Sequence, residues 1–286
     1  MKTKHFLVTG MIGIALAGMI ITGCKKESAA DTDATAAQDD ANASFALQDS
    51  KNISDGAAKG QANERAMGTC GSWVGDSSAT TDTIDIHFAG GCVSPDGRVR
   101  KGDIIVYWTK GKNYFDSGAS ITETWKNYSI TSLSGLTMAI AGSRTLTNIG
   151  KNDSGDHSWS FNASLTLTYS GSTTGTATWN SNRTNVLTKI GSVWYYVITG
   201  GASGVSKSGV SYSLTINSPL YWTAYWLNKG WLTGTKYCDC FESGTVELTR
   251  SGKTYPLYLT FTSGVGNCAH TATATINGNN YNITLP

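Results

Sequence analysis

The chain has few charged residues, few prolines and few strong helix formers. Only 15% of its 286 residues are Asp, Glu, Lys or Arg. The formal net charge is +2 and becomes 0 once residues 1–23, which hold two lysines and no acid, are removed. A neutral chain lacks the basic surface that binds nucleic acid. Four prolines and 33 glycines, beside many Ser and Thr, argue against a helical protein.

Catalytic motifs are missing as well. No Gly-x-Ser-x-Gly elbow is present, and the spacing of the acids identifies no pair for glycoside hydrolysis. His157 stands near Asp153 and Asp156, and Asp85 and His87 share one face of a predicted strand. Polar groups of this kind in turns and at strand edges are usually solvated, so we expect a protein that is not an enzyme.

The first 24 residues have the pattern of an export signal. Lys2 and Lys4 form a basic start, and residues 6–21 are an apolar run. The run is roughly 16 residues long, shorter than the roughly 20 that span a bilayer as a helix. Gly23 and Cys24 close it. This start resembles that of bacterial lipoproteins, which implies cleavage before Cys24 and acylation of Cys24, for example with palmitate.

The residues after Cys24 bear on location. Lys25, Lys26 and Glu27 follow directly, with no Asp in the first position. A charged cluster here resembles the surface-export signal of Bacteroidota lipoproteins. It implies a chain anchored in the outer membrane and compatible with exposure at the cell surface. The expected partners are the membrane, through the anchor, and a glycan or an envelope protein.

Three regions follow from composition: a signal peptide at residues 1–23, a tether at 24–68 and a β domain at 69–286. Residues 28–68 are rich in Ala, Asp, Ser and Asn and hold one aromatic residue, Phe45. Such a segment has too little apolar surface to offset its ordering entropy. We expect a lipidated Cys and a flexible, disordered tether that spans roughly 35–40 Å. A short helix near residues 57–67 is an alternative.

The rest of the chain has an all-β pattern. Apolar and polar residues alternate, for example at residues 83–88 and 103–108, between turns rich in Gly, Asn and Ser. Asn277 and Gly278 indicate a tight hairpin. We expect roughly 12 to 14 strands in a large antiparallel meander, forming a curved sheet, a half-barrel or a sandwich, with one wet face.

A turn at residues 94–102 carries a second resemblance. Asp96, Gly97, Arg98, Arg100 and Gly102 follow Cys92, as in an uncharacterised family of β-rich outer-membrane lipoproteins of Bacteroidota. Further matching residues are Gly118, Thr145, Leu146, Thr147, Asn148, Gly244, Thr245, Val246, Gly264, Gly266, Asn267 and Cys268. The family motif has Asp after the last Cys, where this chain has Ala269. The resemblance implies a β-rich envelope lipoprotein with no known activity.

The two arginines of this turn have two interpretations. Arg98 and Arg100 are two positions apart and therefore lie on one face of the strand. They bind an anion, or they pair with acids of the same chain. We favour pairing with acids.

Cysteines are expected to form disulfides, because the envelope is oxidising. Cys70 with Cys92 would close a loop of about 22 residues, worth roughly 3 kcal/mol. Cys238 and Cys240 face the same way on a strand, about 6.6 Å apart, too far to bridge each other. One of the two therefore pairs with Cys268, and we favour Cys240; the other is left as an odd thiol.

A structural zinc site is the alternative for the same region. Cys238 and Cys240 form one pair of ligands, and Cys268 and His270 form another. If their strands adjoin, four ligands converge, which is the usual number for structural zinc. Otherwise we expect no cofactor.

Aromatic residues are concentrated late in the chain. Tyr221, Trp222, Tyr225, Trp226 and Trp231 fall within one short segment. If one side of this cluster is exposed, it forms a flat platform on which sugars or peptides stack. The protein would then be a carbohydrate-binding surface module. The alternative is that the two sides are core and interface.

Overall fold

The computed structural model describes residues 31–58, 70–78, 81–224, 227, 241–262 and 270–286. All of them belong to one compact unit, Asp31–Pro286. Its described residues form one helix, α1 (Thr35–Ala58), and thirteen strands. The strands are β1 (Gly71–Ser77), β2 (Thr81–Val93), β3 (Val99–Thr109), β4 (Ser120–Thr131), β5 (Leu136–Lys151), β6 (His157–Gly171), β7 (Gly175–Ile190), β8 (Val193–Val205), β9 (Ser211–Thr223), β10 (Phe241–Arg250), β11 (Leu257–Phe261), β12 (Thr271–Ile276) and β13 (Asn279–Thr284).

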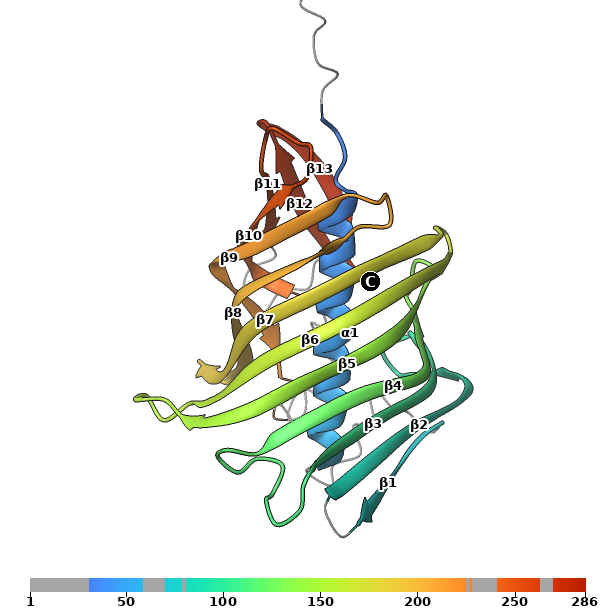
Figure 1. The fold of residues 1–286 in the computed structure, drawn as a ribbon, viewed down its shortest axis with the longest axis vertical. Coiled ribbons are helices and arrows are strands. Elements are labelled where there is room, and N and C mark those ends of the chain that lie inside the picture. The colour runs from blue at the N-terminus through green and yellow to red at the C-terminus, as the bar shows by residue number, and fades with distance from the viewer. Residues whose placement is uncertain (1–30, 59–69, 79–80, 225–226, 228–240, 263–269) are drawn as a thin grey trace, which may run out of the picture. The chain divides into compact units, whose positions relative to one another are not determined.

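The strands form one sheet in the order of the chain, from β1 to β13. Every neighbouring pair is antiparallel, as short turns between successive strands dictate. The sheet is open, with β1 and β13 at its two edges. The prediction of an all-β antiparallel meander is confirmed, in the form of a single curved sheet (Figure 1).

The last hairpin forms where Asn277 and Gly278 predict it. Ile276 pairs with Asn279 across a two-residue turn. Asn277 has φ 47° and Gly278 has φ 77°, the left-handed conformations that such a turn requires.

The curvature has an identifiable local cause where β3 meets β4. The register shifts between Lys101 and Asp103, opposite Asn127, which is itself left-handed with φ 51°. Gly102 has φ 86°, and a Cβ there would lie 2.2 Å from the Asn127 carbonyl oxygen. Only glycine permits this approach, and bulges of this kind bend a strand.

The inner face of the sheet, defined here as the side that packs against α1, holds the core. Buried and more exposed side chains alternate along much of the sheet, as in β6, where Phe161, Leu165 and Leu167 are buried. Figure 1 shows α1 crossing the inner face of this bent sheet at an angle to the strands.

The prediction of a flexible tether is wrong for residues 35–58. They form α1, in which nearly every residue is buried, including Phe45 and Ile53. The segment has little apolar surface of its own, but the sheet supplies partners for its polar side chains. Residues 59–68, part of the alternative short helix, lie outside the described residues. Among the residues that the structure describes, no helix combines the length and hydropathy needed to cross a bilayer.

Candidate functional site

Helix α1 is a polar helix buried on all sides. Asp40, Asp49, Lys51 and Asp55 are each at most 2% exposed. A helix buried on all sides is normally hydrophobic, and a buried charge is unfavourable unless it is paired and hydrogen-bonded. The inner face must therefore supply polar partners along the whole helix.

The first group of partners holds the chain just before α1. The Asp31 carboxylate accepts hydrogen bonds from Arg250 Nη2 at 2.7 Å and Lys253 Nζ at 3.0 Å. Burial raises the pKa of Asp31, but the bonds from Lys253 and Arg250 outweigh it, so the pKa is lowered. Asp33 Oδ1 accepts from the Thr35 amide at 3.0 Å, which satisfies a free donor at the helix start.

The second group lies at the middle of α1, against β7. Asp40 Oδ1 accepts from Trp179 Nε1 at 2.7 Å and lies 3.5 Å from Arg183 Nη2. Arg183 Nη1 donates to Ser44 Oγ at 2.9 Å. Burial raises the pKa of Asp40 against the opposing charge of Arg183, and burial likewise lowers the pKa of Arg183. Both shifts favour the neutral forms, so this pair is held at an electrostatic cost.

The third group joins the second half of α1 to β4 and β5. Arg144 Nη1 donates to the Leu47 carbonyl oxygen at 2.5 Å, and Nη2 donates to Glu123 Oε2 at 2.5 Å. Ser54 Oγ donates to the same Glu123 oxygen at 2.7 Å. Arg144 and Glu123 are at most 1% exposed. The Arg144 guanidinium and the Glu123 carboxylate, from adjacent strands, therefore bind the helix together: Arg144 binds its backbone, and Glu123 binds the Ser54 hydroxyl.

Lys51 is the one cation of the helix, and it is enclosed. Its Nζ lies 2.6 Å from Asp55 Oδ2, 4.7 Å from the centre of the Trp159 ring and 4.4 Å from that of Tyr196. Burial lowers the pKa of Lys51, and the charge of Asp55 opposes this. The hydroxyls of Tyr114 and Tyr196 donate to the Asp55 carboxylate. The charge is thus surrounded by a carboxylate and two aromatic faces.

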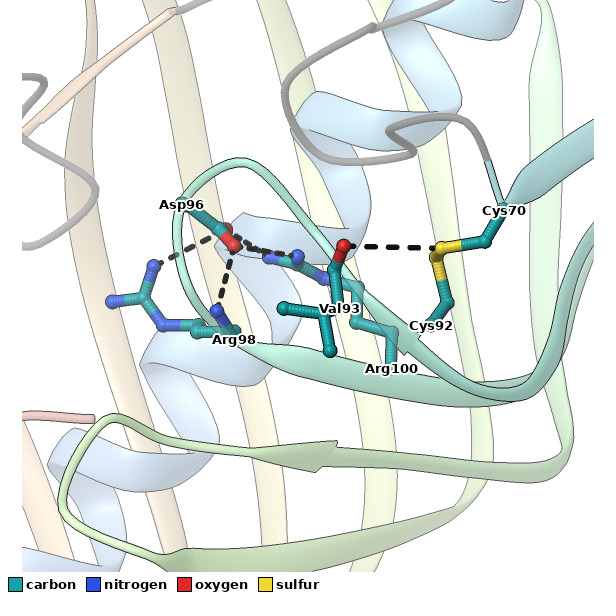
Figure 2. The surroundings of a disulfide bond; sticks show 6 residues. All are labelled: Cys70, Cys92, Val93, Asp96, Arg98 and Arg100. Carbon is teal, nitrogen blue, oxygen red and sulfur yellow. Dashed lines mark hydrogen bonds and ion pairs between the residues drawn. A yellow bond between two sulfur atoms is a disulfide. The ribbon is translucent and has the colours of Figure 1, made fainter.

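The turn at residues 94–102 contributes the last group (Figure 2). Arg100 Nη2 lies 2.6 Å from Asp96 Oδ2 and 2.8 Å from Asp49 Oδ1 of α1. The charges of Asp49 and Asp96 raise the pKa of Arg100 well above its usual value, although burial opposes them. Arg98 Nη2 donates to the Pro286 carbonyl oxygen at 2.7 Å. Both arginines pair within the chain, as the favoured interpretation expects, and the motif clamps α1 and the last residue of the sequence.

The first predicted disulfide is present. Cys70 and Cys92 are bonded, with their Cα atoms 5.4 Å apart, and the Cys70 sulfur lies 3.9 Å from the Val93 carbonyl oxygen (Figure 2). The bond ties the start of β1 to the turn that carries Arg98 and Arg100. Cys240 and Cys268 lie outside the described residues.

The prediction that Trp222 belongs to an exposed aromatic platform is wrong. Trp222 is fully buried, with ring centres 5.7 Å from Phe45 and 4.9 Å from Phe241. It belongs to the core because the inward position of β9 points it toward α1. Tyr221 is half-buried and lies edge-on to Tyr195. Tyr225, Trp226 and Trp231 lie outside the described residues.

The zinc alternative receives no support from the described part. Cys238, Cys240 and Cys268 lie outside it, while His270 is half-buried and follows directly on that gap. Burial, and then the charge of Arg98, lower the pKa of His270. Within the described ranges, no three His, Cys, Asp or Glu side chains gather closely enough to hold a metal.

The two histidines near acids in the sequence have partners elsewhere in the sheet. His87 Nδ1 lies 2.5 Å from Asp103 on the adjacent strand. Asp156 accepts from Thr188 Oγ1 at 3.0 Å, and His157 stacks on Trp159 with ring centres 6.0 Å apart. His157 therefore borders an aromatic surface.

Sequence reasoning missed the polar inner face, although a signal for it exists. Arg144 and Arg183 stand at positions where the alternation of their strands demands an inward side chain. A charged residue at such a position needs a buried partner of opposite charge. Asp40 is such a partner for Arg183, and Glu123 is one for Arg144.

No protein-family model, curated protein or solved structure matches the chain. The inner face and its helix must therefore be interpreted from their own geometry.

Proposed function

We propose that the protein is a bacterial outer-membrane lipoprotein, anchored through Cys24, with a structural or binding role and no catalytic activity. The observation that supports it is the position of α1 in the sequence and in the sheet. Thr35, its first residue, stands 11 positions after Cys24. The seven positions from Cys24 to Asp31 span at most about 25 Å when fully extended. An acylated Cys24 would therefore keep the sheet close to the membrane.

The anchor would be coupled to the sheet through paired charges. Two acyl chains already give stable membrane attachment, and each buried methylene adds about 0.8 kcal/mol. A force on Cys24 would pass first to Asp31, held by Arg250 and Lys253, and then along α1 to Arg183 and Arg144. The polar inner face would distribute this load over strands that are distant in the sequence.

The outer face supports a binding role toward a neutral partner. Thr145, Asn162 and Asn182 pair across β5, β6 and β7, and Asn162 and Asn182 are exposed. Hydroxyl and amide side chains donate and accept hydrogen bonds without carrying charge. Such a surface suits a glycan or another envelope protein, and it gives nucleic acid no cationic contact.

Acylation is the direct test. The producing bacterium is fed an alkyne fatty acid, and the wild-type protein is compared with Cys24→Ala and with Cys238→Ser as the matched cysteine control. We expect label and membrane sedimentation in the wild type and the control, and neither in Cys24→Ala. Protease treatment of intact cells then reports surface exposure. An unlabelled wild type, or a Cys24→Ala protein that still sediments with membranes, would contradict the proposal.

A further inference from the structure

An aromatic pocket of about 230 Å³ lies at the ends of β6, β7 and β8. The half-buried side chains of Trp194 and Phe115 supply two walls, while Leu187, Leu227 and the almost fully buried Trp159 complete the apolar lining. Asp156 and His157 are the polar side chains that line it. A concave, mostly apolar site with a few convergent polar groups is the usual form of a small-ligand site. This volume suits one six-membered ring with its substituents.

Backbone hydrogen bonds hold the walls in place. Asn148 Nδ2 donates to the Phe115 carbonyl oxygen at 2.8 Å, and Asn148 is itself fully buried. The Ala224 amide donates to the Trp194 carbonyl oxygen at 2.9 Å. The Asp156 amide donates to Asn152 Oδ1 at 2.9 Å. These bonds fix Phe115, Trp194 and Asp156 relative to the neighbouring chain, and fixed walls lower the ordering cost of binding.

The charges around the pocket select a neutral ligand. Lys51 Nζ lies 4.7 Å from the centre of the Trp159 ring, and Lys189 Nζ lies 5.9 Å from that of Trp194. These two cations already use the attraction that an aromatic cage would offer to a positively charged ligand. The Asp156 carboxylate also lines the pocket, and its negative charge disfavours an anionic ligand.

The polar groups select a ring that carries hydroxyls. Asp156 Oδ2 accepts from Thr188 Oγ1 at 3.0 Å, which fixes the carboxylate beside the pocket. The His157 ring is held nearly parallel to Trp159, with an interplanar angle of 27°. A carboxylate accepts hydrogen bonds from hydroxyls, and aromatic faces pack against the C–H face of a pyranose.

We propose that this pocket binds one neutral pyranose ring of a glycan. The inference goes beyond the proposed anchor and does not depend on it, because every residue that lines the pocket lies in the sheet or in the segments that connect its strands. The proposed carbohydrate contact does not include Trp222, which is buried in the core.

The test is saturation-transfer NMR on the mature protein, Cys24 to Pro286, purified in a detergent without a sugar headgroup. The probes are glucose, galactose, mannose and N-acetylglucosamine, with cyclohexanol and choline as apolar and cationic comparisons. We expect transfer to the C–H protons of at least one sugar. Trp194→Ala should lower the affinity for that sugar about tenfold, which is 1.4 kcal/mol. Asp156→Asn should lower the affinity several-fold.

Tyr258→Ala is the matched control, since it removes an exposed aromatic side chain on another strand. It should leave binding unchanged. No transfer to any sugar, stronger transfer to cyclohexanol or choline, or an unchanged affinity in both folded pocket variants would overturn the proposal. An unacylated protein that still binds the sugar would refute the anchor alone.

Discussion

The two ends of the inner face hold α1 and the core by different means. Strands β10 to β12 bury mainly apolar side chains, such as Leu248, Leu259 and Ile276, each fully inaccessible, together with Glu242 and Arg250 of β10. Strands β3 to β7 bury Arg144 and Arg183 with their acid partners among their apolar side chains. Apolar burial stabilises in proportion to area, whereas a buried ion pair is favourable only when every partner is present. We infer that the apolar end supplies stability and the polar end fixes the position of α1.

Deleting residues 31–58 should have the largest effect. The deletion leaves Arg100, Arg144, Arg183 and Arg250 without their helix partners in an emptied inner face. We expect a chain that does not fold, by circular dichroism and by cooperative urea unfolding. Deletion of residues 25–30 is the control and should fold normally. A flexible tether would instead give a fully folded protein after either deletion.

Arg144→Met breaks the polar end at one point. Glu123 would lose its guanidinium partner while remaining buried, which costs about 3–5 kcal/mol of unfolding free energy. The double variant Arg144→Met with Glu123→Gln should recover much of this loss. Lys126→Met, at an exposed position of β4, should stay within about 0.5 kcal/mol of the wild type. Urea titration measures all three, and an equal loss in the single and double variants would argue against the pair.

Leu248→Ala probes the apolar end. A buried leucine truncated to alanine loses about 2–5 kcal/mol, including the cavity that remains. Because no charge changes, the loss should be the same in low and high salt, which urea titrations at two ionic strengths would show. Leu133→Ala, at a side chain that is 63% exposed, should have little effect. A strong salt dependence would mean that this end also relies on charges.

Asp39→Asn should have the smallest effect and the clearest pH dependence. Burial raises the pKa of Asp39, although the Lys207 amide donates to its carboxylate at 2.7 Å. The native state then binds more protons than the unfolded state above pH 3.8, so wild-type stability falls as pH rises through the raised pKa. The variant should therefore be more stable than the wild type at pH 7 and equally stable below pH 3.8, which urea titrations at the two pH values would show. A gain that is equal at both pH values would exclude the ionisation as its cause.

Local patterns in the sequence predicted much of the sheet. Alternation at residues 83–88 and 103–108 falls within β2 and β3, and Asn277 with Gly278 gives the last hairpin, because these features depend on neighbours in the chain. Cys70 and Cys92 could be paired from their spacing and compartment.

Helix α1 could not be predicted in the same way. Its stability depends on partners such as Arg144, 97 residues from Leu47, and composition alone cannot reveal such partners. Likewise, Trp222 faces the core because its position in β9 brings it against Phe45. A cluster of aromatic residues in the sequence does not show which of them point inward.

The central claim is that α1 is an integral part of the folded sheet and not a tether. Hydrogen–deuterium exchange of the mature protein tests it most directly, with peptides from residues 35–58 compared with peptides from β6 and β7. We expect the amides of α1 to be protected as strongly as those two central strands, since both are buried on the same inner face. Complete exchange of residues 35–58 at the earliest time point, with β6 and β7 still protected, would contradict the claim.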